Sequence, residues 1–143
     1  MAVPAVPDRA IETLVAAELG EAGRVALAYA PARARAGFAA VLALDAVLAR
    51  VALPAREPLP AQLKLAWWRE ACGGLPEGRG HPVLTALAAH WGADSAPLVA
   101  LVDAWEEIAA GAGGLAEAAE AVADRRGRVL ALCVGEDEAV ARE

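Results

Sequence analysis

The sequence predicts an all-α protein, a helical bundle, on three observations. Alanine, a strong helix former, supplies roughly half of the hydrophobic residues, which make up 58% of the 143-residue chain. β-Branched residues never form the alternating runs that a sheet requires. Large apolar residues recur instead at helical spacing, between glycines and prolines that divide the chain into helix-length segments. The length suits a single domain over residues 1–143.

Start and stop signals divide this domain into seven helices. Asp8 is placed to cap the first helix, and Asp94 or Ser95 to cap the sixth. His81 precedes a proline that opens the fifth helix. We expect helices over residues 8–19, 21–29, 32–52, 59–72 and 82–91, a sixth from its cap to 110, and a seventh over 115–134, followed by an acidic tail over 136–143 that frays.

The third and sixth segments are predicted to form the core, because each carries one continuous apolar stripe. Val41, Leu44 and Leu48 repeat at helical spacing, and Phe38 and Val51 extend the same stripe. The sixth segment places five apolar residues on one face, namely Leu98, Leu101, Val102, Trp105 and Ile108.

Charge and cysteine content exclude several function classes. Thirteen basic residues against nineteen acidic ones give a net charge of -6, the wrong sign for a protein that neutralises nucleic-acid phosphates. Cys72 and Cys133 form no CxxC motif and have no histidine at zinc-ligand spacing, so we expect reduced thiols. His90 has no nucleophile at a recognisable spacing, which argues against a hydrolase.

The distribution of apolar residues predicts a cytoplasmic protein that is at most peripheral to the membrane. The first residues lack the basic region of a signal peptide and reach Asp8 before an apolar stretch forms. The apolar run over residues 38–44 is stopped by Asp45 and Arg50, far short of the length that crosses a bilayer. We therefore expect no transmembrane segment.

Five sequence blocks then indicate a family. RVALAYAPARARAGFAAVLALDAVLARV, EPLPAQLKLAWWREA, HPVLTALAA, the helix ending LVDAWEE, and ADRRGRVLALCVG resemble the squalene/phytoene synthase family in order and spacing. They are most similar to the divergent bacterial branch that also resembles the mitochondrial complex I assembly proteins of that family. The resemblance covers roughly residues 20–135, and LAWWREA is its most specific block. It corresponds to the N-terminal half of a full-length member.

This resemblance implies part of an isoprenoid (terpenoid) synthase fold, in which helices surround a cavity for prenyl diphosphates. Active members join two such molecules head to head, with Mg²⁺ ions held by two aspartate-rich motifs that neutralise the diphosphate. The aspartates of the first motif would fall near Ala49 and Arg50 of this sequence. In the family the second motif belongs to a helix downstream of the RG pair, so its aspartates are not expected within residues 1–143. We therefore expect neither metal ligands nor catalytic residues here.

Asp45 and Arg126 are charged residues on apolar helix faces. On a helical wheel Asp45 falls between Phe38 and Val41, and Arg126 lies in line with Val122 on the last helix, together with Leu115 and Cys133. Opposite charges in such positions predict an ion pair in the core, whose disruption would cost about 3–5 kcal/mol. Gly127, beside Arg126, suggests a close helix approach or access to a cavity.

Other candidate binding residues are Trp67, Trp68 and Arg33. The two adjacent tryptophans point about 100° apart, so one is expected in the core and the other at its edge, or facing a cavity or partner. Arg33 and Arg35 could contact phosphate groups, although surface solubility explains most arginines here. Asp103, with Glu106 and Glu107, has the spacing of a divalent-cation site but lies away from the apolar stripe, which favours a solvated face.

Two functions from different classes remain. The first is a degenerate, non-catalytic family member, a pseudoenzyme that acts as a binding or assembly protein. Its partner would be a protein, a second copy meeting it through an exposed apolar face, or an isoprenoid-like lipid. The alternative is an active head-to-head prenyltransferase of isoprenoid biosynthesis, a transferase that uses Mg²⁺ and is completed by another chain or by a missing C-terminus.

Overall fold

The chain folds as a bundle of helices in the computed structural model. The structure describes residues 8–53, 57–75, 80–91, 94–111 and 113–135. They form α-helices and one short 3-10 helix with no strand among them, as the sequence predicts. In chain order the elements are α1 (Asp8–Glu18), α2 (Glu21–Ala28), η1 (Ala32–Ala34), α3 (Arg35–Ala52), α4 (Pro58–Gly73), α5 (Pro82–His90), α6 (Ala96–Ala110) and α7 (Leu115–Val134).

The helix limits agree with the expected ones within one or two residues, apart from the third segment. That segment begins with the 3-10 turn η1 before α3 starts at Arg35. Pro31 precedes the turn, and the Arg35 side chain donates a hydrogen bond to the Ala30 carbonyl across it, at 3.3 Å. The predicted frayed tail over residues 136–143 lies outside the described residues.

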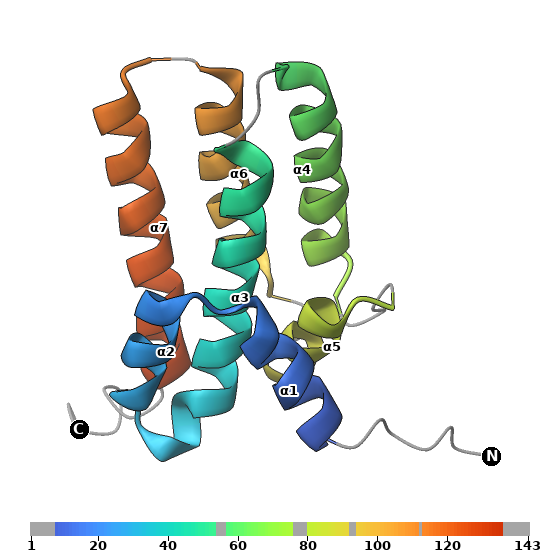
Figure 1. Ribbon diagram of the computed structural model, residues 1–143, viewed down its shortest axis with the longest axis vertical. Coiled ribbons are helices and arrows are strands. Elements are labelled where there is room, and N and C mark those ends of the chain that lie inside the picture. Colours follow the sequence, from blue (N-terminus) through green and yellow to red (C-terminus); the bar gives the residue numbers. More distant parts are fainter. Residues whose placement is uncertain (1–7, 54–56, 76–79, 92–93, 112, 136–143) are drawn as a thin grey trace.

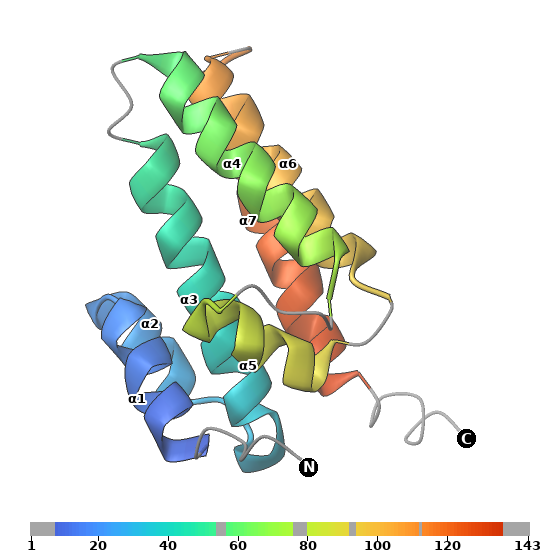
Figure 2. The same ribbon diagram turned by 90° about the vertical axis from the view of Figure 1, so that its right-hand side faces the viewer.

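Four long helices run side by side, and three shorter ones pack at one end of them (Figure 1). Along the chain α3, α4, α6 and α7 alternate in direction, and extensive contacts join α4 to α6 and α6 to α7. Helices α1 and α5 pack against the first half of α3 and against each other, and α2 also contacts α3 (Figure 2). Helix α3 therefore contacts every other helix of the fold.

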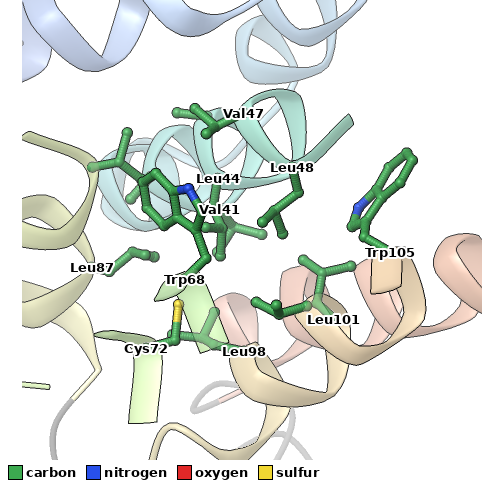
Figure 3. Packing of buried hydrophobic residues seen from close by; sticks show 14 of the residues in the cluster. Val41, Leu44, Val47, Leu48, Trp68, Cys72, Leu87, Leu98, Leu101 and Trp105 are labelled. Carbon is green, nitrogen blue, oxygen red and sulfur yellow. The ribbon is translucent and has the colours of Figure 1, made fainter. Parts of the chain in front are cut away.

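The core is centred on α3, as its apolar stripe predicts. Val41, Leu44 and Leu48 are fully buried, whereas Phe38 and Val51 at the ends of the stripe are partly buried. These side chains meet Leu98 and Leu101 of α6, Leu87 of α5, and Trp68 and Cys72 of α4 (Figure 3). Burial raises the pKa of the Cys72 thiol from 9.0 to about 12, so this cysteine is an inert core residue.

The residues before α5 and α6 differ in how they cap their helices. His81 caps α5: its Nδ1 accepts a hydrogen bond from the Val83 N–H at 3.1 Å. Ser95 occupies the position before α6, but its side chain makes no capping hydrogen bond. Its backbone carbonyl instead accepts the N–H groups of Leu98 and Val99, so the serine cap is wrong in its chemistry although right in its position.

Candidate functional site

Asp45 lies in the middle of α3, where two hydrogen bonds hold its carboxylate. The residue is only 8% exposed. Its Oδ1 accepts the indole N–H of Trp105 at 2.9 Å, and its Oδ2 accepts the guanidinium N–H of Arg126 at 2.7 Å. Trp105 comes from α6 and Arg126 from α7, so one carboxylate joins three helices. Both oxygens of a buried anion are thereby satisfied.

The predicted pairing of Asp45 with Arg126 is confirmed. The pair sits at the edge of the core, since the Arg126 side chain is 37% exposed and the Asp45 side chain 11%. Solvent therefore screens the arginine end, and losing that partner costs less than a fully buried pair would. Sequence reasoning missed Trp105 as the second partner, because its place on the apolar face of α6 gives no sign of where the indole N–H points.

Gly127 does not have the role suggested for it. It is exposed, and a Cβ built at this position would meet no atom of the described residues within 4 Å. Neither a close helix approach nor a cavity therefore explains this glycine. Leu115, which was expected in line with Arg126 on the apolar face, is 70% exposed, because the first turn of α7 extends beyond the core.

Trp67 and Trp68 divide as their adjacent positions predict. Trp68 is 6% exposed and packs in the core, whereas Trp67 is 39% exposed on the outer face of α4. Their rings meet edge to face with centroids 5.1 Å apart, and Trp68 makes a similar contact with the His81 ring at 4.8 Å. Trp68 is therefore a core residue, and Trp67 is available at the surface.

A polar cavity of about 260 Å³ lies where four elements meet: η1, the first turn of α3, the end of α5 and the end of α7. It is lined by Arg33, Ala34, Gly37, His90, Trp91, Leu132 and Cys133. Of the candidate residues only Arg33 lies here. The other lining residues were missed, because they come together only when the ends of separate helices meet.

Trp91 and Cys133 give this cavity its chemical character. The Trp91 Nε1–H is buried and has no hydrogen-bond partner among the described residues. Burial raises the pKa of the Cys133 thiol, so Cys133 is a neutral group. Gly37 completes the wall at the α3 side, where a Cβ would approach Cys133 Sγ at 3.6 Å and His90 Cγ at 3.7 Å.

A second, more open hollow of about 320 Å³ lies between the end of α3 and the start of α4. It is lined by Val47, Arg50, Val51, Glu57, Pro60, Ala61 and Lys64. Its walls are mainly apolar, with charged groups at the rim.

The acidic group on α6 does not form a cation site. Asp103 is ion-paired with Arg69 of α4 at 2.8 Å, and Glu107 is exposed. The pKa of Glu106 is raised, first by partial burial and then by the neighbouring Asp103 charge. Among the described residues no three histidine, cysteine or acidic side chains are grouped as metal ligands would be. Glu107 is exposed, whereas Asp103 and Glu106 are half-buried, so the solvated-face interpretation holds only in part.

A family model described as squalene/phytoene synthase matches residues 23–112, well over half of the chain. The chain belongs to the squalene/phytoene synthase family. No curated protein and no solved structure matches it. The matched region begins within α2 and ends after α6, so it includes Asp45 and Trp105 but not Arg126.

The donor set of this squalene/phytoene synthase family member does not fit the Mg²⁺ ions that the resemblance implies. Asp45 is the acidic residue of α3, and both of its oxygens are engaged. Ala49 and Arg50, where the first aspartate-rich motif would fall, supply no carboxylate. Arg50 instead forms an ion pair with Glu18 of α1. Mg²⁺ needs several oxygen ligands in a nearly octahedral arrangement, which this face of α3 does not provide.

In the described residues no helix is both long enough and apolar enough to cross a bilayer.

Proposed function

We propose that this squalene/phytoene synthase family member is a non-catalytic cytoplasmic protein that acts by binding, and that a second copy of the chain is the partner held by its α4 face. The observation that carries the non-catalytic part is the Asp45 carboxylate. Asp45 already accepts one hydrogen bond at each carboxylate oxygen, and a Mg²⁺ ion ligated by Asp45 would lie beside the Arg126 guanidinium.

The electrostatics oppose such ligation. The Arg126 guanidinium that is bonded to Asp45 Oδ2 would repel a metal ion held by the same carboxylate. Five residues further along α3, Arg50 lies near where the resemblance places an aspartate, and it pairs with Glu18. The contacts of Asp45 are those of a structural strut that joins α3, α6 and α7.

The binding part of the proposal rests on an apolar ridge along the outside of α4. Leu59 and Leu63 are each 65% exposed and Trp67 is 39% exposed. Their spacing of four residues puts the three side chains in one row on the helix. Large apolar side chains grouped in this way mark contact surfaces. The mostly apolar hollow between α3 and α4 borders the same helix.

A second copy fits this ridge because the ridge is self-complementary. When two α4 helices pack antiparallel about Leu63, each Leu59 lies opposite the partner's Trp67, and the two Leu63 side chains meet. The same row then serves both chains, as a two-fold interface requires.

The cytoplasmic part of the proposal is supported by the cysteines. Cys72 is buried and Cys133 is partly buried, and both are free thiols, which agrees with a reducing compartment.

The non-catalytic part is tested by supplying farnesyl or geranylgeranyl diphosphate with Mg²⁺ and measuring diphosphate release. We expect no release above that of the Asp45→Asn variant or of buffer. Mg²⁺-dependent release that Asp45→Asn abolishes would contradict the proposal and support a head-to-head prenyltransferase.

The association is tested by size-exclusion chromatography with light scattering. We expect a dimer for the unaltered chain and a monomer for Leu63→Glu, because the charge would be buried at the centre of the two-fold contact. Leu115→Glu is the matched control, since this leucine is similarly exposed but lies on α7. A strict monomer at all concentrations, or a dimer that Leu63→Glu leaves intact, would contradict the proposed partner.

A further inference from the structure

The hollow between the end of α3 and the start of α4 has a lining that suits an indole ring. Its apolar walls are formed by Val47, Val51, Pro60 and Ala61. Glu57 and Lys64 also line it and bring a carboxylate and an ammonium group. An indole has an apolar body, one N–H that needs an acceptor, and a π face that attracts a cation. Each of these three properties has a counterpart in the hollow.

Trp67 is a tryptophan that stands ready for such a contact. It is 39% exposed on the outer face of α4, whereas Trp68 and Trp105 are each 6% exposed. Trp67 does not line the hollow of its own chain. A large aromatic side chain left this exposed in a row of leucines is typical of a contact with a partner.

The two-fold pairing proposed for the α4 ridge brings the tryptophan of one chain to the hollow of the other, and the inference rests on that pairing. When two α4 helices pack antiparallel about Leu63, the partner's Trp67 lies level with Leu59. This level falls between Glu57 and Ala61, two residues of the hollow's wall. The indole and the hollow therefore coincide along the helix axis.

The two features also lie on the same side of the ridge. With 3.6 residues per turn, Trp67 points about 40° to one side of Leu63. Pro60 and Lys64 of the hollow lie about 60° and 100° to that same side. A two-fold axis perpendicular to the helices keeps this side common to both chains. The partner's Trp67 consequently leans toward the hollow.

We propose that Trp67 of each chain inserts into the hollow between α3 and α4 of the other chain. Two identical contacts then flank the central pair of Leu63 side chains. In each contact the indole N–H donates to the Glu57 carboxylate, and the Lys64 ammonium lies against the ring. The volume of about 320 Å³ admits an indole, and tryptophans seated in a partner's pocket often dominate the free energy of an interface.

NMR on a mixed dimer tests this contact directly. One preparation of the full chain carries ¹⁵N and a second carries ¹³C-labelled valine methyl groups, so that an NOE between the two labels arises only between chains. The Trp67 indole signal is the one lost in Trp67→Phe, and the Val51 methyl signals are those lost in Val51→Ile. We expect NOEs from the Trp67 indole protons to the Val51 methyl groups, and none when both chains carry Leu63→Glu.

Filling the hollow from within gives a second test. Val51→Phe changes α3 and leaves the α4 ridge intact, yet it should weaken association about tenfold, because the new ring takes the place of the indole. Leu42→Phe is the matched control, since this residue is also a partly buried aliphatic of α3 but does not line the hollow. Lys64→Gln should weaken association roughly two- to fivefold through the lost cation–π contact.

Analytical ultracentrifugation measures these dissociation constants, and circular dichroism verifies the fold of each variant. Absence of the NOE in a dimer that Leu63→Glu dissociates would overturn the inference and leave the ridge pairing in place. Equal affinities for Val51→Phe and Leu42→Phe would do the same. A strict monomer at all concentrations would overturn the ridge pairing and this inference together.

Discussion

Two regions of this molecule differ in the hydrogen bonding of a buried tryptophan N–H. In the middle of the bundle, the Trp105 N–H donates to Asp45, which also accepts from Arg126. At the end of the bundle, the Trp91 N–H is buried beside Arg33 and His90 without an acceptor among the described residues. Helices α3 and α7 contribute to both regions, so the same scaffold places one tryptophan N–H against an acceptor and leaves the other without one among the described residues.

The contrast shows which polar groups hold the fold together. A cluster whose donors and acceptors are matched stabilises the fold. By this criterion Asp45, the residue with the most conspicuous position in the sequence, is structural.

The largest expected effect comes from removing the acceptor in the middle of the bundle. Asp45→Ala leaves the Trp105 N–H buried without a partner and releases Arg126, so it should lower the free energy of unfolding by about 3 kcal/mol. Urea denaturation measures this change. A loss below about 1 kcal/mol would mean that the cluster does not stabilise the bundle.

The next largest effect is a loss of folding stability at alkaline pH, caused by the buried Cys72 thiol. Its pKa is raised from 9.0 to about 12 in the folded protein, so between these values the unfolded chain has lost a proton that the folded chain retains. Stability should then fall as pH rises above 9, by about 1.4 kcal/mol per pH unit from this group. Unfolding at pH 8, 9, 10 and 11 should show this slope.

Two alanine variants show which thiol causes the fall in folding stability with rising pH. Cys72→Ala should remove most of it. Cys133→Ala should remove less, because the pKa of this partly buried thiol is raised in the same direction but the residue is more exposed. An unchanged slope in Cys72→Ala would contradict the burial of this thiol.

The two tryptophans provide a matched pair of substitutions. Trp105→Phe should cost about 1–2 kcal/mol, because Asp45 Oδ1 is left without its donor. Trp91→Phe should change stability by less than about 0.5 kcal/mol, since it removes a donor that has no acceptor among the described residues. Thermal denaturation of both variants in one buffer makes the comparison. Equal losses would remove the distinction between the two regions.

Arg126→Gln should have the smallest effect within the cluster. The arginine side chain is 37% exposed and Asp45 keeps its bond to Trp105, so the expected loss is about 1 kcal/mol. A double-mutant cycle with Asp45→Ala measures the coupling directly. Additive losses would show that the ion pair contributes no stability of its own.

Helical periodicity was enough to predict the helices, the core stripe of α3 and the Asp45–Arg126 pair. A carboxylate between Phe38 and Val41 has to find a partner, and Arg126 is a cation on another apolar stripe. The Trp105 bond could not be predicted, because a helix position does not fix the direction of an indole N–H. The interpretation of Gly127 was wrong, because a glycine on an exposed helix face cannot be distinguished in sequence from a glycine at a close helix contact.

The cavity could not be predicted from the sequence, for a different reason. Its lining comes from η1, α3, α5 and α7, and its position depends on how four elements pack at one end of the bundle. Arg33 was chosen as a phosphate-binding candidate by residue type alone. His90, Trp91 and Cys133 have no common motif, so only their spatial arrangement brings them together.

The most direct test of the account follows the Trp105 indole signal while Mn²⁺ is added together with inorganic pyrophosphate. Its nitrogen lies 2.9 Å from the Asp45 carboxylate, so a paramagnetic ion bound there would broaden this signal beyond detection. If Asp45 is a structural strut, the Trp105 signal persists at Mn²⁺ concentrations that saturate ordinary magnesium enzymes. Selective loss of the Trp105 signal would place a metal on Asp45 and contradict the account.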